Sequence, residues 1–261
     1  MNPCNLPSLY FTTRSSNATS DDRFPSATLK RARSNCLASP RILCARAFAC
    51  ERSARAAAMR ANADVIVRAS VIELVPYRVE HVERYHEWMG DESILVSTAS
   101  ERLTLEQELE MQREWANDEA KCTFIVRDAK TSTMIGDVNF FFNDHDDARA
   151  CEIEIMIAEP SYRRKGYATE ALETFMAYGA MELGVTTFVA KIGFENEPSL
   201  GLFTRLGYVE RSRSEIFQEV TLELRARDSN GDALSRFSDV WSRVERGSYD
   251  AHEARRLADG S

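Results

Sequence analysis

Long apolar runs are missing from this sequence of 261 residues. No stretch approaches the roughly 18 consecutive apolar residues that a membrane-spanning helix requires, so we expect no membrane partner. The apolar region of a secretory signal is also missing, and the six cysteines are therefore expected to be reduced thiols without a disulfide framework. The formal net charge of −8 argues against a nucleic-acid partner. Together these absences favour a cytoplasmic protein.

Several catalytic motifs are absent as well. The sequence has no Gly-x-Ser-x-Gly elbow of a serine hydrolase and no glycine loop that ends in Gly-Lys-Ser/Thr for nucleotide binding. The four histidines, at positions 81, 86, 145 and 252, lack the spacing of metal ligands, so we expect no metal. Cys122 and Cys151 each lie inside an apolar run, and we expect buried thiols there in place of nucleophiles.

Charge divides the chain into two parts. Residues 1–60 carry ten Lys and Arg against three Asp and Glu, whereas residues 61–261 carry 23 against 38. The basic part is typical of a mitochondrial transit segment, and equally of a disordered tail or of an extension upstream of a start at Met59. We therefore separate residues 1–58 from a folded domain at 59–225. A polar tail, with a weak amphipathic stretch, fills 226–261.

Hydrophobic periodicity predicts the order β-α-α-β-β-β-α-β-α-β-β for the folded domain. Thr104 and Gln107 form a capping-box pattern at the start of the second helix. Three strand candidates then follow with only polar turns between them, which favours an antiparallel meander. The expected segments are a hairpin at 65–77, helices at 80–89 and 104–115, strands at 122–128, 134–142 and 151–158, a helix at 168–183, a strand at 186–193, a short helix at 196–207 and a closing hairpin at 208–224.

A basic, glycine-bearing turn precedes the clearest helix, in the sequence "EPSYRRKGYATEAL" at 159–172. The N-terminus of a helix presents unpaired N–H groups and the positive end of the helix dipole. Gly166 permits close approach of a ligand, and Arg163, Arg164 and Lys165 add positive charge. This combination favours a phosphate or pyrophosphate site, with a merely solvated basic turn as the alternative.

Two segments resemble the GNAT acetyltransferases. Arg163-x-x-Gly166-x-Ala168 is similar to the acetyl-CoA loop of that superfamily, and "NEPSLGLFTRLGY" at 196–208 is similar to its pantetheine-side helix. The element order is also that of the superfamily, and the wider resemblance is to its RimJ/RimL-like branch over about residues 59–225. The resemblance implies an α+β fold with three α/β/α layers. Its mixed, mostly antiparallel sheet would hold a central acetyl-CoA-binding strand, loop and helix.

The resemblance also implies direct acetyl transfer from acetyl-CoA to an amine of a protein or peptide, with an N-terminal α-amine as the favoured acceptor. Backbone groups of one strand would pair with the pantetheine arm, the loop would hold the pyrophosphate, and the short helix would line the other side. The residues implied are Ile155, Met156 and Ile157 for the strand, Arg163, Arg164, Lys165, Gly166, Tyr167, Ala168 and Thr169 for the loop, and Asn196, Ser199 and Phe203 for the helix.

Glu152 and Glu154 are the candidates for the base that deprotonates the acceptor, because alternation along a strand places both on one face. A solvated polar face, with water as the base, is the alternative. Phe203 stands where many members of the superfamily have a tyrosine, and phenylalanine cannot protonate the leaving thiolate. We expect Tyr208 to be a core residue. A GNAT-fold module that binds acetyl-CoA or a protein partner with little turnover is therefore a second hypothesis.

Overall fold

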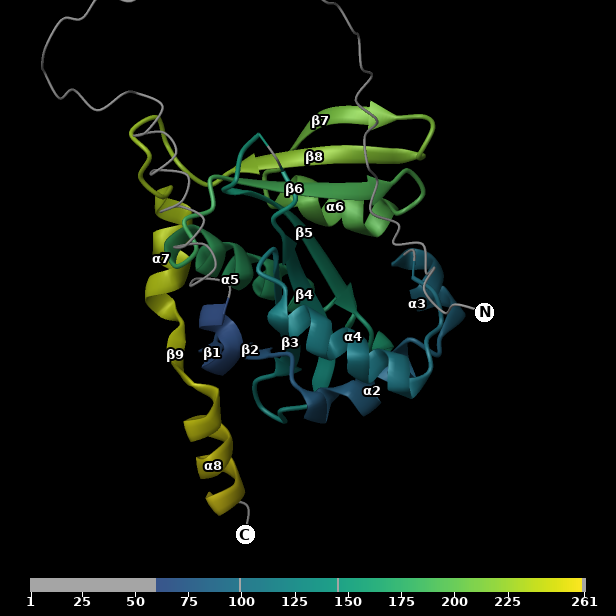
Figure 1. Cartoon of the computed structure of the whole chain (residues 1–261). Helices are drawn as coiled ribbons and strands as arrows, with labels where there is room; N and C mark the ends of the chain where they lie inside the picture. The colour runs from purple at the N-terminus through teal and green to yellow at the C-terminus, as the bar shows by residue number, and fades with distance from the viewer. Residues whose placement is uncertain (1–59, 99, 145, 260–261) are drawn as a thin grey trace, which may run out of the picture.

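The computed structural model describes residues 60–98, 100–144 and 146–259 (Figure 1). The expected extension at 1–58, the proposed start at Met59 and one histidine, His145, lie outside the described residues. Within those ranges, none of the helices combines the length and the apolar character that crossing a membrane requires.

One mixed sheet forms the centre of the described chain, with the strand order β7-β8-β6-β5-β4-β3-β2-β1-β9. Only β5 and β6 run parallel, and every other neighbouring pair is antiparallel. The predicted meander is confirmed as β3, β4 and β5. The strands are β1 (Val65–Arg68), β2 (Ile72–Pro76), β3 (Lys121–Asp128), β4 (Met134–Phe141), β5 (Ala150–Ile157), β6 (Thr187–Gly193), β7 (Val209–Ser214), β8 (Glu219–Arg225) and β9 (Glu245–Ser248).

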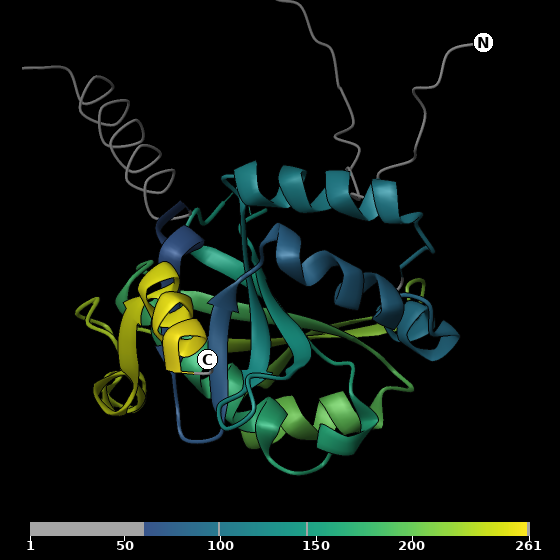
Figure 2. The same ribbon diagram turned by 90° about the horizontal axis from the view of Figure 1, so that it is seen from below.

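Helices cover both faces of this sheet, which confirms the expected three-layer α+β architecture. Figure 2 shows α2 and α4 over one face, with α6 on the opposite side. The α-helices are α2 (Val82–Trp88), α3 (Glu92–Ser97), α4 (Leu105–Asn117), α5 (Tyr167–Met181), α6 (Glu197–Arg205), α7 (Ser235–Arg243) and α8 (Tyr249–Asp259). Short 3₁₀ turns are η1 (Arg60–Asp64), η2 (Val79–His81) and η3 (Pro160–Tyr162).

Alternation along the central strands separates two hydrophobic cores. Phe124 and Phe140 point to one side and pack against Phe175 of α5. Ile125 and Met156 point to the other side and pack beneath α2 and α4. Cys122 and Cys151 belong to the first core and are buried thiols, as predicted. Burial raises the pKa of the Cys122 thiol well above its usual value, so the group is not a ready nucleophile.

Local signals placed most helix boundaries. Thr104 Oγ1 accepts from the Gln107 amide at 3.3 Å and the Gln107 side chain accepts from the Thr104 amide at 2.8 Å, so the predicted capping box is confirmed. Helix α3 was not predicted, because "ESILVS" is too short to show helical periodicity.

The segment 226–261, expected to be a polar tail, contains α7, β9 and α8. Its amphipathic stretch inserts Phe237 and Trp241 into the first core, where they are 2% and 6% exposed. Strand β9 pairs with β1 and adds a ninth strand to the described sheet. Its sequence, "ERGS", has no apolar pattern, so only the partner strand explains its conformation.

Candidate active site

The two parallel strands of the sheet diverge at its centre. β5 and β6 pair only between Ala150–Glu152 and Thr187–Val189. Beyond that point β5 stays with β4 as far as Ile157, and β6 stays with β8 as far as Gly193. In the described part of the chain, the facing edges at 153–157 and 190–193 therefore lack a strand partner, as the course of β5 and β6 in Figure 1 illustrates. Alternate residues on each edge point their backbone N–H and C=O groups into the gap, where a ligand could bind them, apart from the Ile157 carbonyl, which accepts from Arg163.

Gly136 of β4 supports the free edge of β5. A Cβ atom at this position would lie 1.9 Å from the carbonyl oxygen of Met156. Only glycine permits so close an approach of the two backbones, since real Cβ contacts are never that short. The backbone of Ile155, Met156 and Ile157, predicted to pair with a pantetheine arm, is thus held from behind by β4.

Arg163 closes the loop that follows β5. Its Nε donates to the carbonyl oxygen of Ile157 at 2.8 Å, and its Nη2 donates to that of Ala158 at 3.0 Å. All three cations are exposed, but only the Arg163 guanidinium is hydrogen-bonded to the end of the strand in the described structure. Charge alone does not distinguish the three cations, but the structure gives Arg163, the arginine of the loop motif, a distinct role in shaping the loop.

Helix α5 begins directly after this loop. Arg164 and Gly166 have positive φ angles of 57° and 90°, so the chain turns through the left-handed region twice before the helix. No side chain caps α5 within the described residues, and a Cβ at Gly166 would meet nothing within 4 Å. The amides of its first turn, which includes Ala168 and Thr169, therefore face open space and suit an anion.

Side chains of the first turn of α5 attach it to the sheet. The Tyr167 hydroxyl donates to Asp128 Oδ2 at 2.7 Å. The Glu170 carboxylate accepts from the amides of Val71 and Ile72, at 2.7 and 3.1 Å, in the turn between β1 and β2. These contacts fix the position of the helix N-terminus relative to the diverging strands.

The other edge is bordered by α6. Asn196 Oδ1 accepts from the Ser199 amide at 3.2 Å and caps this helix. Phe203 is 3% exposed and packs edge-on against Tyr208, with ring centroids 4.9 Å apart. Tyr208 is a core residue as predicted, and its hydroxyl donates to Met176 Sδ at 3.2 Å. That buried contact keeps the Tyr208 proton away from solvent.

Glu152 and Glu154 share the β5 face that lies under α2 and α4, but their surroundings differ. Glu152 Oε2 forms an ion pair with Lys191 Nζ at 2.6 Å. Among the residues that the structure describes, no ion pair engages Glu154, whose side chain is solvent-exposed. The protein around it still displaces enough water that desolvation is the largest influence on its pKa, which is raised to about 7. Glu152 and Asp137 raise it further, while Lys121 and Lys191 lower it.

A buried polar group beside Glu154 was not identified from the sequence. Asn139 lies opposite Glu154 across the β4–β5 ladder. Thr123 Oγ1 donates to Asn139 Oδ1 at 2.6 Å, and Asn139 Nδ2 donates to Asp137 Oδ2 at 2.7 Å. Burial raises the pKa of Asp137 to about 6. The sequence does carry a signal for this group. Polar residues alternate in "KCT" at 121–123 and in "DVN" at 137–139, within otherwise apolar strands.

Lys121 completes this group from the start of β3. It is 3% exposed, and its Nζ lies 3.5 Å from the ring centroid of Trp115 and 3.7 Å from that of Phe141. Burial lowers its pKa to about 8, although Glu154 and Asp137 favour the charged form. The arrangement therefore brings one cation and two carboxylates together under α4.

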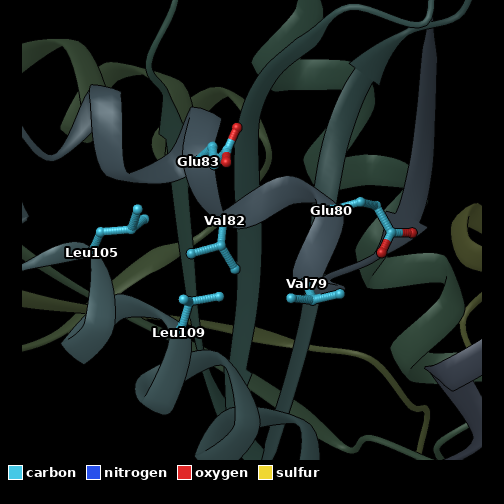
Figure 3. Close-up of a pocket in the computed structure, with 6 residues that line it drawn as sticks. All are labelled: Val79, Glu80, Val82, Glu83, Leu105 and Leu109. Atoms are coloured by element: carbon cyan, nitrogen blue, oxygen red, sulfur yellow. The ribbon is translucent and has the colours of Figure 1, made fainter.

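A pocket of about 330 Å³ lies between η2, α2 and α4 (Figure 3), and none of the residues predicted to bind acetyl-CoA lines it. The diverging strands, unlike this pocket, offer the free backbone N–H and C=O groups that amides of an extended ligand can pair with. The lining residues are Val79, Glu80, Val82, Glu83, Leu105 and Leu109.

Comparison with known proteins agrees with this geometry. Residues 72–209 match the model of the acetyltransferase (GNAT) domain family. An N-acetyltransferase 9-like protein of Nematostella vectensis is 52% identical over 181 residues, which cover 66% of this chain and 90% of that protein. The alpha/beta-tubulin-N-acetyltransferase 9 of Mus musculus is 51% identical over 176 residues, covering 64% of this chain and 73% of that protein.

Solved structures agree on the fold. The spermidine N-acetyltransferase of Vibrio cholerae, solved in complex with CoA and spermine, has a TM-score of 0.52 at 20% sequence identity. The match covers 63% of this chain and 96% of that structure. At this identity the likeness concerns the fold alone. The expected GNAT fold is therefore confirmed, and the chain is similar to N-acetyltransferase 9 proteins.

Proposed function

Since this chain belongs to the GNAT acetyltransferase family and is an acetyl-CoA-dependent N-acetyltransferase, we propose that its acceptor is the N-terminal α-amine of a protein. The observation that carries this proposal is the environment of Glu154. Its carboxyl lies beside the diverging strands, is free of the ion pair that engages Glu152, and has a pKa raised to about 7.

Glu154 is matched to an α-amine by its proton affinity. An α-ammonium group has a pKa of about 7.7–8.0, within about one unit of the carboxyl, whereas a lysine ammonium has a pKa of about 10.4. Proton transfer from the α-ammonium to Glu154 is therefore nearly balanced, but transfer from lysine costs about three pKa units. The neutral amine then forms the amide bond as the C–S bond of the thioester breaks. The departing thiolate takes up a proton, and Glu154 releases the one that it accepted.

The acetyl-CoA substrate supplies the activated acyl group, and the residues present fit it. Ile155 offers its backbone N–H and C=O at the free edge, whereas the Met156 carbonyl faces Gly136 of β4 and the Ile157 carbonyl accepts from Arg163. The uncapped first turn of α5, at Gly166 and Tyr167, offers amides to the pyrophosphate. Arg164 and Lys165 add positive charge beside it.

Tubulin is the acceptor to test first, because a mouse relative at 51% identity is named as an alpha/beta-tubulin N-acetyltransferase. We therefore propose a tubulin chain as the physiological substrate and place this protein in the RimJ/RimL-like branch.

The experiment measures release of free CoA with matched peptides. One peptide carries the N-terminal sequence of α- or β-tubulin with a free amine, and its control carries the same sequence with an acetylated N-terminus and an internal lysine. We expect release with the first peptide alone. Equal release with both would move the acceptor to lysine, and no release with any amine, despite acetyl-CoA binding, would reject turnover.

Phe203 favours the second candidate, a module that binds acetyl-CoA or a protein partner with little turnover. The nearby Tyr208 hydroxyl donates to Met176 Sδ and is no substitute for a tyrosine at position 203. The same CoA-release assay separates the two candidates, because binding without release on every peptide is the outcome that this second hypothesis requires.

We also propose that the protein acts in the cytoplasm and that residues 1–58 precede its catalytic domain as an extension. Mass spectrometry of the N-terminus of the endogenous protein tests the extension. Cell fractionation tests the location, and recovery in mitochondria with residues 1–58 removed would favour the transit-segment alternative.

A further inference from the structure

We propose that Lys121 is a positioning residue for the catalytic base: its buried ammonium, held between Trp115 and Phe141, keeps the carboxyl of Glu154 in its proton-accepting form. The inference deepens the proposed function and rests on the role of Glu154 as the base. It concerns a residue that lies on the far side of β4 from Glu154.

The position of Lys121 is unusual for a lysine. It is the first residue of β3 and is 3% exposed, although lysines are almost never fully buried without a partner. In the described chain no carboxylate lies within ion-pair distance of its Nζ. The two aromatic rings, at 3.5 and 3.7 Å, take the place of water. Such cation–π contacts stabilise an ammonium more strongly in a site without water than at an exposed surface.

The sheet register aims this charge at the carboxylates. Lys121 lies opposite Phe141, and Phe141 lies opposite Glu152. One step along the same face, Thr123, Asn139 and Glu154 form the next row across the three strands. The ammonium therefore lies one row from Glu154 on the same face, and because it is itself buried its charge is screened less than that of a surface cation.

Several other groups act on the same carboxyl, and each comes from an identified element. The charged or titratable groups that act on Lys121 or Glu154 are Asp137 of β4, Glu152 of β5, Lys191 of β6, Tyr85 of α2, Asp118 after α4 and, from the opposite face of the sheet, Cys122 of β3. Among the cations, Lys121 has the larger effect on Glu154 and Lys191 the smaller. Lys191 also forms an ion pair with Glu152, so its charge is already partly neutralised.

The sign of the effect follows from these charges. Desolvation and the neighbouring carboxylates raise the pKa of Glu154, and Lys121 opposes them. Without the ammonium the carboxyl would hold its proton to higher pH and would not accept another from the acceptor. If the pKa of Glu154 rose by about one unit, activity would fall about tenfold at pH values well below the original pKa. It would fall less than about twofold at pH values above the raised pKa.

The test replaces Lys121 with methionine, which keeps the length and apolar stem but removes the charge. Lys121→Arg is the conservative variant, because a guanidinium also stacks on aromatic rings. Lys130→Met is the matched control, since it removes an equal charge from an exposed turn. Glu154 is titrated by ¹³C NMR of its carboxyl carbon, assigned by its loss in Glu154→Gln, and the pH profile of kcat/KM is measured in parallel.

We expect Lys121→Met to move both the NMR midpoint and the acidic limb of kcat/KM upward by about one pH unit. In Lys121→Arg and in Lys130→Met, the NMR midpoint and the acidic limb should both stay at the values of the unchanged protein. Unchanged midpoints in a folded Lys121→Met protein would overturn the inference, whatever its activity. The NMR titration needs no turnover, so it separates failure of this inference from failure of Glu154 as the base, which an unaffected Glu154→Gln rate would reveal.

Discussion

Lys191 Nζ lies 2.6 Å from Glu152 Oε2, and this ion pair engages one of two carboxylates that share a face of β5. The second carboxylate, Glu154, is left beside the diverging strands. Two residues that the sequence could not rank are therefore distinguished by a lysine from the next strand.

The first prediction follows from that difference. Glu154→Gln should lower kcat/KM by about 10²–10⁴, the usual contribution of a positioned base. Glu152→Gln should retain most of the activity. Steady-state CoA release with the tubulin N-terminal peptide measures both variants. Equal losses in the two would contradict the assignment of the base.

The pH dependence supplies a second check on the same carboxyl. A protonated carboxyl cannot accept another proton, so kcat/KM should fall as the pH drops through the pKa of Glu154, about 7. Glu152 raises that pKa, and its neutralisation should therefore move the acidic limb to lower pH. A limb that stayed in place in Glu152→Gln would show that another group controls the rate.

Arg163 and Arg164 are adjacent cations with different expected effects on acetyl-CoA binding. Arg163→Met removes two hydrogen bonds from the loop to the end of β5, and we expect Kd to rise about tenfold, or about 1.4 kcal/mol. Arg164→Met removes an equal charge from an exposed side chain and should raise Kd less than about threefold. Titration calorimetry measures both. The assignment fails if Arg164→Met weakens binding more than Arg163→Met does.

Gly136→Ala should damage both the stability and the cofactor edge. Its Cβ would meet the carbonyl oxygen of Met156 at 1.9 Å, and relief of that clash should lower the free energy of unfolding by about 1–3 kcal/mol. Gly247→Ala is the control, because its nearest neighbour, Ile66 Cγ2, would be 3.8 Å away. Urea unfolding gives the stabilities and calorimetry gives the Kd for acetyl-CoA. Similar stabilities for the two variants would argue against the close approach of β4 and β5.

Arg127 connects the sheet to the C-terminal helix. It donates to Glu73 Oε2 at 2.8 Å and to Glu253 Oε1 of α8 at 2.9 Å while its own side chain is 4% exposed. Arg127→Met would leave buried Glu73 with Arg68 as its remaining arginine partner, so we expect a loss of about 1.5–3 kcal/mol in the free energy of unfolding. Arg256→Met removes an exposed partner of Glu253 and should cost less than about 1 kcal/mol. Urea unfolding measures both variants, and equal losses of unfolding free energy in the two would contradict the assignment.

The sequence sufficed for features that depend on neighbours along the chain. The capping box at Thr104, the glycine turn at Gly166 and the alternation of Glu152 and Glu154 are all local patterns, and each was found in the structure as expected. Local patterns also placed the meander, because strands joined by short polar turns pair with each other in order.

Features that depend on the register between strands could not be predicted from the sequence. Lys121, Asn139 and Glu154 are separated by 15 residues or more along the chain, and they meet only because β3, β4 and β5 align in one register. A shift of a single residue would turn each side chain to the opposite face. The pairing of β9 with β1 joins residues still farther apart, and "ERGS" carries no sign of it.

That last pairing has a consequence for synthesis of the chain on the ribosome. Val65, in the first strand, pairs with Ser248, in the last. The outer edge of β1 must therefore wait, with its backbone groups unpaired, until residues 245–248 have been translated. Strands joined over such a separation form slowly, and an open edge is a template for association with other nascent chains. Truncations near the C-terminus should thus be recovered in aggregates even when the acetyl-CoA strands are intact.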